Sequence, residues 1–288
     1  MKQYVLPALI ANAAGLGIHW IYDHEYLKDF AKKQSLLFMK QEKEHFDKAK
    51  PSFYVYPDAE VGDVSVQGHI LKWLFKALKD NPDYTAEEFE KMLYKKFKPG
   101  GDYKGYVESY GKEQVFNHLI KDLKQDIEKI EPNDHQLVGF MPYLVALELG
   151  MSNEEAFEFT KIYSQDDIYL EFFKLFDVLL DRIPELGMKE AVKSIIEESP
   201  AGFIDVFKKA IEMDDTNEFV EEHAGRACPI KHALPVMIHL LYHTESYEEA
   251  IKESALIGGA VSDRNMLLGV FWAQVSDIPK EWQDKVNY

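Results

Sequence analysis

The sequence predicts an all-α protein, folded as one compact multi-helix domain over residues 1–288. Three observations predict this fold class. Apolar residues recur at spacings of three and four, as they do from Phe172 to Leu179, which is the period of one helix face. Polar capping patterns open several of these segments, and no stretch shows the alternation of a strand convincingly. With 46% hydrophobic and 13% aromatic residues, the chain has the side chains for a large core.

Capping residues and helix breakers place the individual elements. Gly15 and Gly17 either allow close packing of the first, apolar helix or end it, and residues 51–62 form a loop. Thr85 and Ser152 each precede a glutamate by three residues, which is the pattern of a capping box. Asp63 is expected to cap the helix that follows it. We expect helices over residues 5–18, 25–50, 70–78, 85–98, 109–130, 154–163, 168–180, 188–197, 201–213, 236–242 and 266–272.

The charge and the cysteine content exclude several classes of partner. A net charge of −17 repels nucleic acid and anionic membranes, so neither is expected to bind, although a local site can still hold an anionic small molecule. The single cysteine, Cys228, cannot form an intrachain disulfide and is typical of a reducing compartment. No apolar run reaches the roughly 20 residues of a membrane span. We therefore expect a cytoplasmic protein.

The segment around Gly258-Gly259 organises the rest of the chain. The glycines let the backbone turn tightly or approach another group closely, and a largely apolar helix follows from Met266 to Trp272. We expect Ser262 or Asp263 to cap this helix. A helix N-terminus presents unpaired N–H groups, which can bind an anion or, with added carboxylates, a metal and a sugar diol. The alternative is that the glycines only connect the chain to a core helix.

Several short segments follow one another along the chain in an order that matches a known family. They are residues 15–23 with His19-Trp20-Ile21-Tyr22-Asp23, Ser65-x-x-Gly68, 103–108, 133–136, 225–235, and 258–282 with Ser262-x-Arg264 and Ile278-Pro279-x-x-Trp282. Together they resemble the ADP-ribosylglycohydrolase family, and within it most of all the branch of J-type lens crystallins and selenoprotein J. The resemblance implies the all-α fold of that family and a family reaction that hydrolyses a glycosidic bond to ADP-ribose. It also implies two divalent cations, usually magnesium, that serve this reaction.

This chain departs from the family at the metal ligands. Asn12 stands where the family has an early aspartate, and Val66 and Gln67 replace an acidic pair. Ala260 stands where the family reads Gly-Gly-Asp, and Asp263 is close to the second site but shifted by one residue. Magnesium needs several oxygen ligands, so we expect no metal and no cofactor. Asp58, Glu60 and Asp63 remain as an alternative set of carboxylates that would rebuild a metal site.

The candidate site follows from the resemblance and from side-chain chemistry. His19 and Asp263 are the candidate catalytic residues, because an imidazole titrates near neutral pH and can act as a general base. The alternative for His19 is a packed histidine beside Trp20. The expected ligand is a small molecule, ADP-ribose or a related nucleotide sugar. The candidate ligand-binding residues are Asn12, Ser65, Gln67, Gly258, Gly259, Ser262 and Arg264.

Two other residue sets have open alternatives. Cys228 and His232 lie four residues apart and suggest an activated thiolate, although a buried thiol beside an unrelated histidine is the favoured interpretation. Asp134 either caps a helix or faces the cleft, and we favour the cap.

Three functional hypotheses remain: a metal-independent hydrolase, an inactive ligand-binding protein, and a purely structural protein. Arg264 discriminates among them, because a free guanidinium facing a cleft favours binding. A guanidinium paired internally, with Asp263 or Glu108, favours a structural role. Binding or altered catalysis ranks narrowly first.

Overall fold

The computed structural model describes residues 3–124, 126–131 and 135–287, and the regular secondary structure in these ranges is helical. Only isolated β-bridges, Ile21 with Ser52 and Gln136 with Pro229, interrupt this pattern among the described residues. The all-α prediction is therefore confirmed. The α-helices are α1 Val5–Gly15, α2 His24–Ala31, α3 Lys43–Lys48, α4 Val66–Asp80, α5 Ala86–Phe97, α6 Ser109–Asp122, α7 Met141–Leu149, α8 Asn153–Thr160, α9 Ile168–Leu186, α10 Met188–Ile195, α11 Ile204–Glu212, α12 Thr216–Phe219, α13 Ile230–His243, α14 Tyr247–Ile257, α15 Val261–Trp272 and α16 Lys280–Gln283.

Shorter helical turns join some of these helices. They are the 3-10 segments η1 Leu16–Ile18, η2 Leu137–Phe140 and η3 Ile196–Glu198, and the π-helical turn η4 Val220–Ala224. No helix in the described ranges is both long enough and apolar enough to cross a bilayer.

The first helix and the last long helix form the centre of the molecule. Every residue of α15 is buried, as are ten of the eleven residues of α1, since both helices are apolar around most of their circumference. Two glycines allow the helices to approach closely. A Cβ at Gly15 would lie 2.7 Å from Cγ1 of Val261, and a Cβ at Gly269 would lie 2.7 Å from Cβ of Ala11. The predicted close packing at Gly15 is therefore confirmed.

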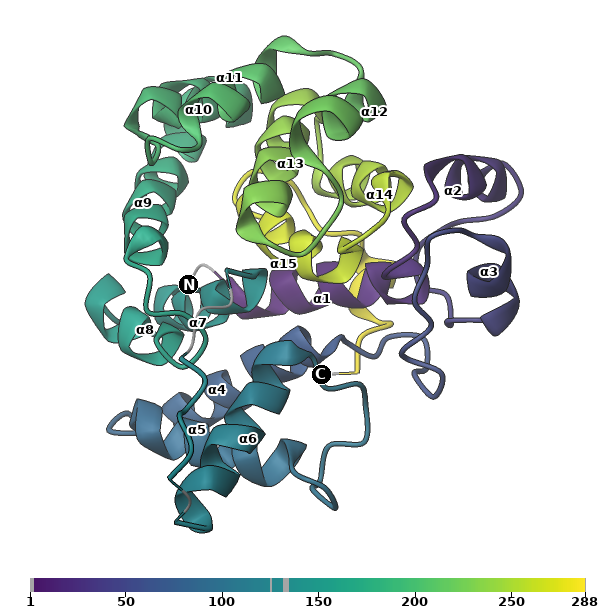
Figure 1. Ribbon diagram of the computed structural model, residues 1–288. Coiled ribbons are helices and arrows are strands. Elements are labelled where there is room, and N and C mark those ends of the chain that lie inside the picture. The colour runs from purple at the N-terminus through teal and green to yellow at the C-terminus, as the bar shows by residue number, and fades with distance from the viewer. Residues whose placement is uncertain (1–2, 125, 132–134, 288) are drawn as a thin grey trace.

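The remaining helices enclose this central pair. Figure 1 shows α4, α5 and α6 on one side of α1 and α15, and α13 and α14 on the other. α4 packs against α1 and α7, while α13 and α14 pack against α15. A long aromatic layer from α9, including Phe172 and Phe176, extends the core towards Phe271 of α15. The two ends of the chain thus meet in the core, where the candidate site lies.

Both predicted capping boxes are present. Thr85 and Glu88 exchange hydrogen bonds at the start of α5, and Ser152 and Glu155 do so at the start of α8. The cap predicted from Asp63 is wrong. Ser65 is the N-cap of α4 and accepts from Gly68 N, whereas Asp63 accepts from Glu60 N at 2.8 Å.

The predicted cap of the glycine-rich segment is also wrong. α15 begins at Val261, with Ala260 as its N-cap, and no side chain caps it. Ser262 and Asp263 already lie inside its first turn, where their side chains point into the protein instead.

Several predicted boundaries differ from the structure. The expected helix over 25–50 is two short helices, α2 and α3, separated by residues 32–42. The helix after residue 108 ends at Asp122 rather than near Ile130, and Asn117 instead bonds the backbone of Ile130 through both ends of its amide. α13 begins earlier than expected, directly after Pro229, and includes Pro235. Asn133 and Asp134 lie outside the described residues.

Candidate functional site

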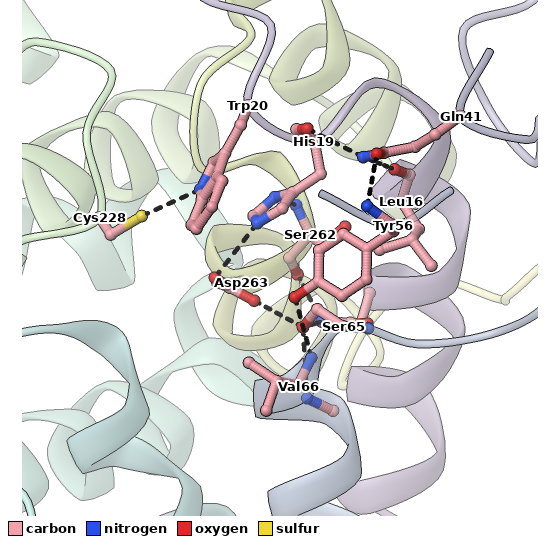
Figure 2. A network of polar contacts seen from close by, with 12 residues as sticks. Leu16, His19, Trp20, Gln41, Tyr56, Ser65, Val66, Cys228, Ser262 and Asp263 are labelled. Carbon is pink, nitrogen blue, oxygen red and sulfur yellow. Dashed lines mark hydrogen bonds and ion pairs between the residues drawn. The ribbon is translucent and has the colours of Figure 1, made fainter. Parts of the chain in front are cut away.

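Three side chains from distant parts of the sequence form a closed hydrogen-bonded cluster at the centre of the fold. Asn12 Nδ2 donates to Ser65 Oγ at 2.9 Å, and Ser65 N donates to Asn12 Oδ1 at 2.8 Å. Ser65 Oγ in turn donates to Asp263 Oδ1 at 2.7 Å. All three residues have an exposed fraction of 0%. The predicted site residues of α1, the start of α4 and α15 therefore do lie together, in the interior (Figure 2).

The local structure explains why these residues meet. Ser65 is the N-cap of α4, so its hydroxyl also accepts from Gly68 N at 3.3 Å. Asn12 Nδ2 reaches the backbone oxygen of Ser262 at 3.1 Å, which ties α1 to the first turn of α15. The cluster thus fixes the relative positions of three helices. The amide of Asn12, the hydroxyl of Ser65 and Oδ1 of Asp263 are used within the cluster, and Asp263 Oδ2 has no hydrogen-bond partner among the described residues.

His19 lies against this cluster and is fully buried. Its Nδ1 accepts from the backbone N–H of Ser262 at 3.2 Å, and its Nε2 lies 3.6 Å from Asp263 Oδ2. Because Nδ1 is an acceptor, the neutral ring carries its proton on Nε2, facing the carboxylate. Burial, together with the positive charge of Arg264, lowers the pKa of His19 to about 3. At neutral pH the imidazole is therefore uncharged, and its only acceptor nitrogen is occupied by the backbone.

Burial shifts the pKa of Asp263 upwards, in the opposite direction to that of His19, because burial disfavours the charged form and an acid is charged when it has lost its proton. Burial raises the pKa of Asp263 to about 7, although the hydrogen bond from Ser65 and the charge of Arg264 oppose the rise. His19 and Asp263 are thus an uncharged base and an acid that titrates near neutrality, held side by side. Groups with such perturbed pKa values are common at functional sites, but this pair has no exposed atom.

Trp20 covers His19. The two rings stack at 5.1 Å between centroids, with 26° between their planes. Trp20 adopts a φ of 73°, which is unusual for a residue other than glycine. Its backbone N–H donates to Gly259 O at 2.8 Å. Figure 2 shows the indole beside His19, with its N–H directed at Cys228.

Gly258 and Gly259 have the structural role that the sequence suggested for glycine. Their φ values are 78° and 70°. A Cβ at Gly259 would lie 2.0 Å from the carbonyl oxygen of Arg226, and one at Gly258 would lie 2.4 Å from that of Ile21. The backbone N–H of Gly259 donates to Ile21 O at 2.7 Å. The glycine pair therefore joins two neighbouring loops, and the segments that it contacts belong to the protein itself.

Arg264 points into the protein. Its exposed fraction is 1%; Nε donates to Ser254 Oγ at 3.1 Å, and Nη2 donates to the backbone oxygens of Ser254 and Gly258 at 2.9 and 3.1 Å. Burial lowers the pKa of the guanidinium to about 10. Its hydrogen-bond partners are thus a hydroxyl and backbone carbonyls on α14, rather than the Asp263 or Glu108 carboxylates that the sequence suggested. Arg264 binds the C-terminal end of α14, which is a favourable place for a cation.

The remaining predicted residues lie in the same interior. Gln67 and Ser262 each have an exposed fraction of 0%. Within the described ranges, neither the amide of Gln67 nor the hydroxyl of Ser262 has a hydrogen-bond partner. Such groups are costly to bury, and they mark this region as a polar interior rather than ordinary core.

A cleft lies above the cluster and was not recognised as a unit from the sequence. Its volume is about 460 Å³. Aromatic residues from three loops form much of its wall, and the buried residues Glu108 and Cys228 also line it. Trp20 is common to the cleft and the cluster, because it lines the first and stacks on the second. The aromatic residues that line the cleft are Trp20, Tyr22, Phe53 and Tyr106.

The chemistry of Cys228 does not match an activated thiolate. Trp20 Nε1 donates to its Sγ at 3.4 Å, while His232 Nδ1 is hydrogen-bonded to the backbone oxygen of Ala224. Burial and the nearby charge of Glu108 raise the pKa of the thiol well above its usual value. The two residues proposed as a pair therefore have separate partners, and the favoured interpretation of a buried thiol agrees with the geometry.

The described residues contain no group of three or more histidine, cysteine, aspartate or glutamate side chains arranged to bind a metal ion. Of the alternative carboxylates, Asp63 accepts from Glu60 N and from Asn287 Nδ2, and Glu60 pairs with Lys40. Both lie on the surface loop before α4. Asp263 is the one carboxylate of the central cluster, and its Oδ1 is taken by Ser65.

The sequence is similar to crystallin J1A of Tripedalia cystophora. The two chains are 21% identical over 311 aligned positions, which cover 99% of this chain and 91% of the crystallin. No family model matches the sequence.

Proposed function

We propose that this protein is an ADP-ribosylglycohydrolase-like protein that binds a nucleotide sugar of the ADP-ribose class without two-metal hydrolysis. The similarity to a crystallin over nearly the full chain supports a relationship of this kind. The proposed binding site is the cleft bounded by Trp20, Tyr106 and Cys228.

The closed Asn12–Ser65–Asp263 cluster is the observation that carries this proposal. A dinuclear magnesium site needs several carboxylate oxygens that face one cavity. Here the corresponding positions supply one carboxylate, one hydroxyl and one amide, and these bond to one another at 2.7–2.9 Å. Residues arranged in this way stabilise the junction of three helices and do not fit a pair of magnesium ions.

The cleft has groups that suit the proposed ligand. The aromatic wall supplies surface on which a purine ring can pack. The carboxylate of Glu108, a buried residue of the lining, is an acceptor for ribose hydroxyls. Lys112, whose ammonium lies 4.8 Å from the centroid of the Tyr106 ring, supplies a positive charge for a phosphate. The cleft lies within the 300–1,000 Å³ range of typical ligand pockets.

Calorimetric titration with ADP-ribose, with and without magnesium, tests the proposal. We expect binding of equal affinity in both conditions and no release of free ribose products on long incubation. Lys112→Met should weaken binding about tenfold, because it removes one charged contact to a phosphate. Lys79→Met is the matched control, since Lys79 also lies over a ring, that of Phe75, away from the cleft. Magnesium-dependent binding or turnover would contradict the proposal.

A purely structural role is the second candidate, and Arg264 favours it. A guanidinium held by Ser254 and Gly258 stabilises the end of α14 and does not face the cleft. If ADP-ribose fails to bind in either condition, the structural role replaces the binding role. The same titration therefore separates the two candidates.

A further inference from the structure

We propose that a second cavity, separate from the cleft, binds a neutral saccharide. This cavity lies between the loop over residues 55–64, the loop over residues 102–106 and the outer face of α4. Its volume is about 680 Å³, larger than that of the cleft. The two hollows share Tyr106 but otherwise have different walls.

Aromatic side chains form one wall of this cavity. Trp73 stacks on His69 at 5.4 Å between ring centroids, and Tyr103 meets both rings edge to face at 5.6 and 5.3 Å. Burial lowers the pKa of His69 to about 4, so its ring is neutral near pH 7. The three rings thus offer a neutral aromatic surface, which suits the C–H face of a sugar ring, and the Lys96 ammonium lies beside it, 4.4 Å from the centroid of the Trp73 ring.

The rest of the lining includes charged side chains of both signs. Asp58, Asp63 and Asp102 supply three carboxylates, and Lys96 and Lys104 supply two ammonium groups. Asp58 and Asp102 make no hydrogen bond or ion pair with any other described residue. Carboxylates accept from hydroxyl groups and ammonium groups donate to them, so both kinds can be satisfied by one polyhydroxylated ligand.

The same charges disfavour the other common ligand classes. An anion such as a nucleotide would meet three carboxylates inside a protein whose net charge is −17. A cation would compete with Lys96, whose ammonium already lies 4.4 Å from the centroid of the Trp73 ring. A saccharide carries no charge and needs both donors and acceptors. The geometry therefore fits a neutral sugar better than either ion.

A panel of neutral mono- to trisaccharides, built from hexoses, pentoses and N-acetylhexosamines, tests this proposal by calorimetry and tryptophan fluorescence. We expect a member of the panel to bind and to change the fluorescence. Trp73→Phe should abolish the fluorescence change and keep the calorimetric signal, because it removes the reporting indole but retains a ring. Trp20→Phe, in the cleft, should leave both signals. Adenosine monophosphate and choline serve as the anionic and cationic probes.

Two further variants locate the polar contacts. Lys104→Met and Asp58→Asn should each weaken saccharide binding about tenfold, the usual loss for a hydrogen bond to a charged group. Lys98→Met is the matched control, because Lys98 lies over Tyr94 and outside the cavity. The proposal is overturned if no saccharide binds or if either ion binds more tightly. It is also overturned if the fluorescence change survives in Trp73→Phe. None of these outcomes depends on whether ADP-ribose binds in the cleft.

Discussion

Replacing Asp263 by asparagine should change how the stability of the protein depends on pH. Asp263 is fully buried, accepts from Ser65 Oγ at 2.7 Å and lies 3.6 Å from His19 Nε2. Asparagine keeps an oxygen for the Ser65 hydroxyl and loses the titrating group. The substitution therefore tests whether the cluster is a buried structural junction whose carboxylate is costly to ionise.

The magnitude follows from the pKa of Asp263 in the folded protein. Below pH 3.8 the carboxyl group is protonated in both the folded and the unfolded chain. As the pH rises, the unfolded chain releases its proton first, and the folded chain releases it only near pH 7. The free energy of unfolding consequently falls over this window. The difference between 3.8 and about 7 corresponds to roughly 4 kcal/mol.

His19 works in the opposite direction. Its pKa is 6.5 in the unfolded chain and about 3 in the folded protein, so the unfolded chain binds the proton first as the pH falls. The stability contributed by the neutral ring is complete above pH 6.5 and is lost as the pH falls towards 3. Between about pH 4 and 6.5 the two residues largely offset each other in the wild type. In Asp263→Asn only the His19 dependence remains.

Urea denaturation at pH 4.5, 6 and 7.5, followed by tryptophan fluorescence, measures the effect. We expect the stability of Asp263→Asn, relative to the wild type, to rise by about 3 kcal/mol from pH 4.5 to 7.5, since part of the full change lies outside this range. Asp58→Asn is the control, because that side chain is exposed and hydrated in both states. A difference between Asp263→Asn and the wild type that stays constant within about 1 kcal/mol would refute the reasoning. It would mean that the buried carboxylate ionises as readily as a hydrated one.

Three further predictions concern stability and reactivity. Gly259→Ala should lower the free energy of unfolding by about 3 kcal/mol or more, because its φ of 70° and the Arg226 carbonyl leave no room for a Cβ. Gly202→Ala, where a Cβ meets open space, should change it little, and equal losses in urea denaturation would contradict this account. Thr85→Ala should cost about 1 kcal/mol through the lost capping box, measured in the same way. Cys228 should react slowly with iodoacetamide in the native protein and quickly in urea; rapid native alkylation would show an activated thiolate.

The sequence predicted the local features of this protein well where one or two residues decide the outcome. The capping boxes at Thr85 and Ser152 and the close packing at Gly15 follow from short-range chemistry, and each is present. The failed caps at Asp63 and Asp263 have a different cause. The buried Ser65, rather than Asp63, takes the capping position of α4, and Asp63 accepts from Glu60 N. α15 begins at Val261, so Asp263 already lies inside the helix, where it accepts from Ser65.

The sequence predicted which residues form the candidate site, but not how their side chains are bonded and buried. The resemblance identified Asn12, His19, Ser65 and Asp263, and these residues do lie together. Sequence could not show that they bond to one another, that Trp20 covers them, or that Arg264 turns towards α14. These features depend on how the side chains are oriented in the folded protein.

The sequence by itself therefore determined the all-α class, the two capping boxes and the turns at the glycine pair. Each of these depends on residue type and on neighbours within a few positions, which is the range over which helical periodicity and backbone sterics act. Only the tertiary structure decided which polar groups are exposed. Burial shifts the pKa values of His19 and Asp263 in opposite directions, and burial comes from α1, α4 and α15 meeting across more than 240 residues of sequence.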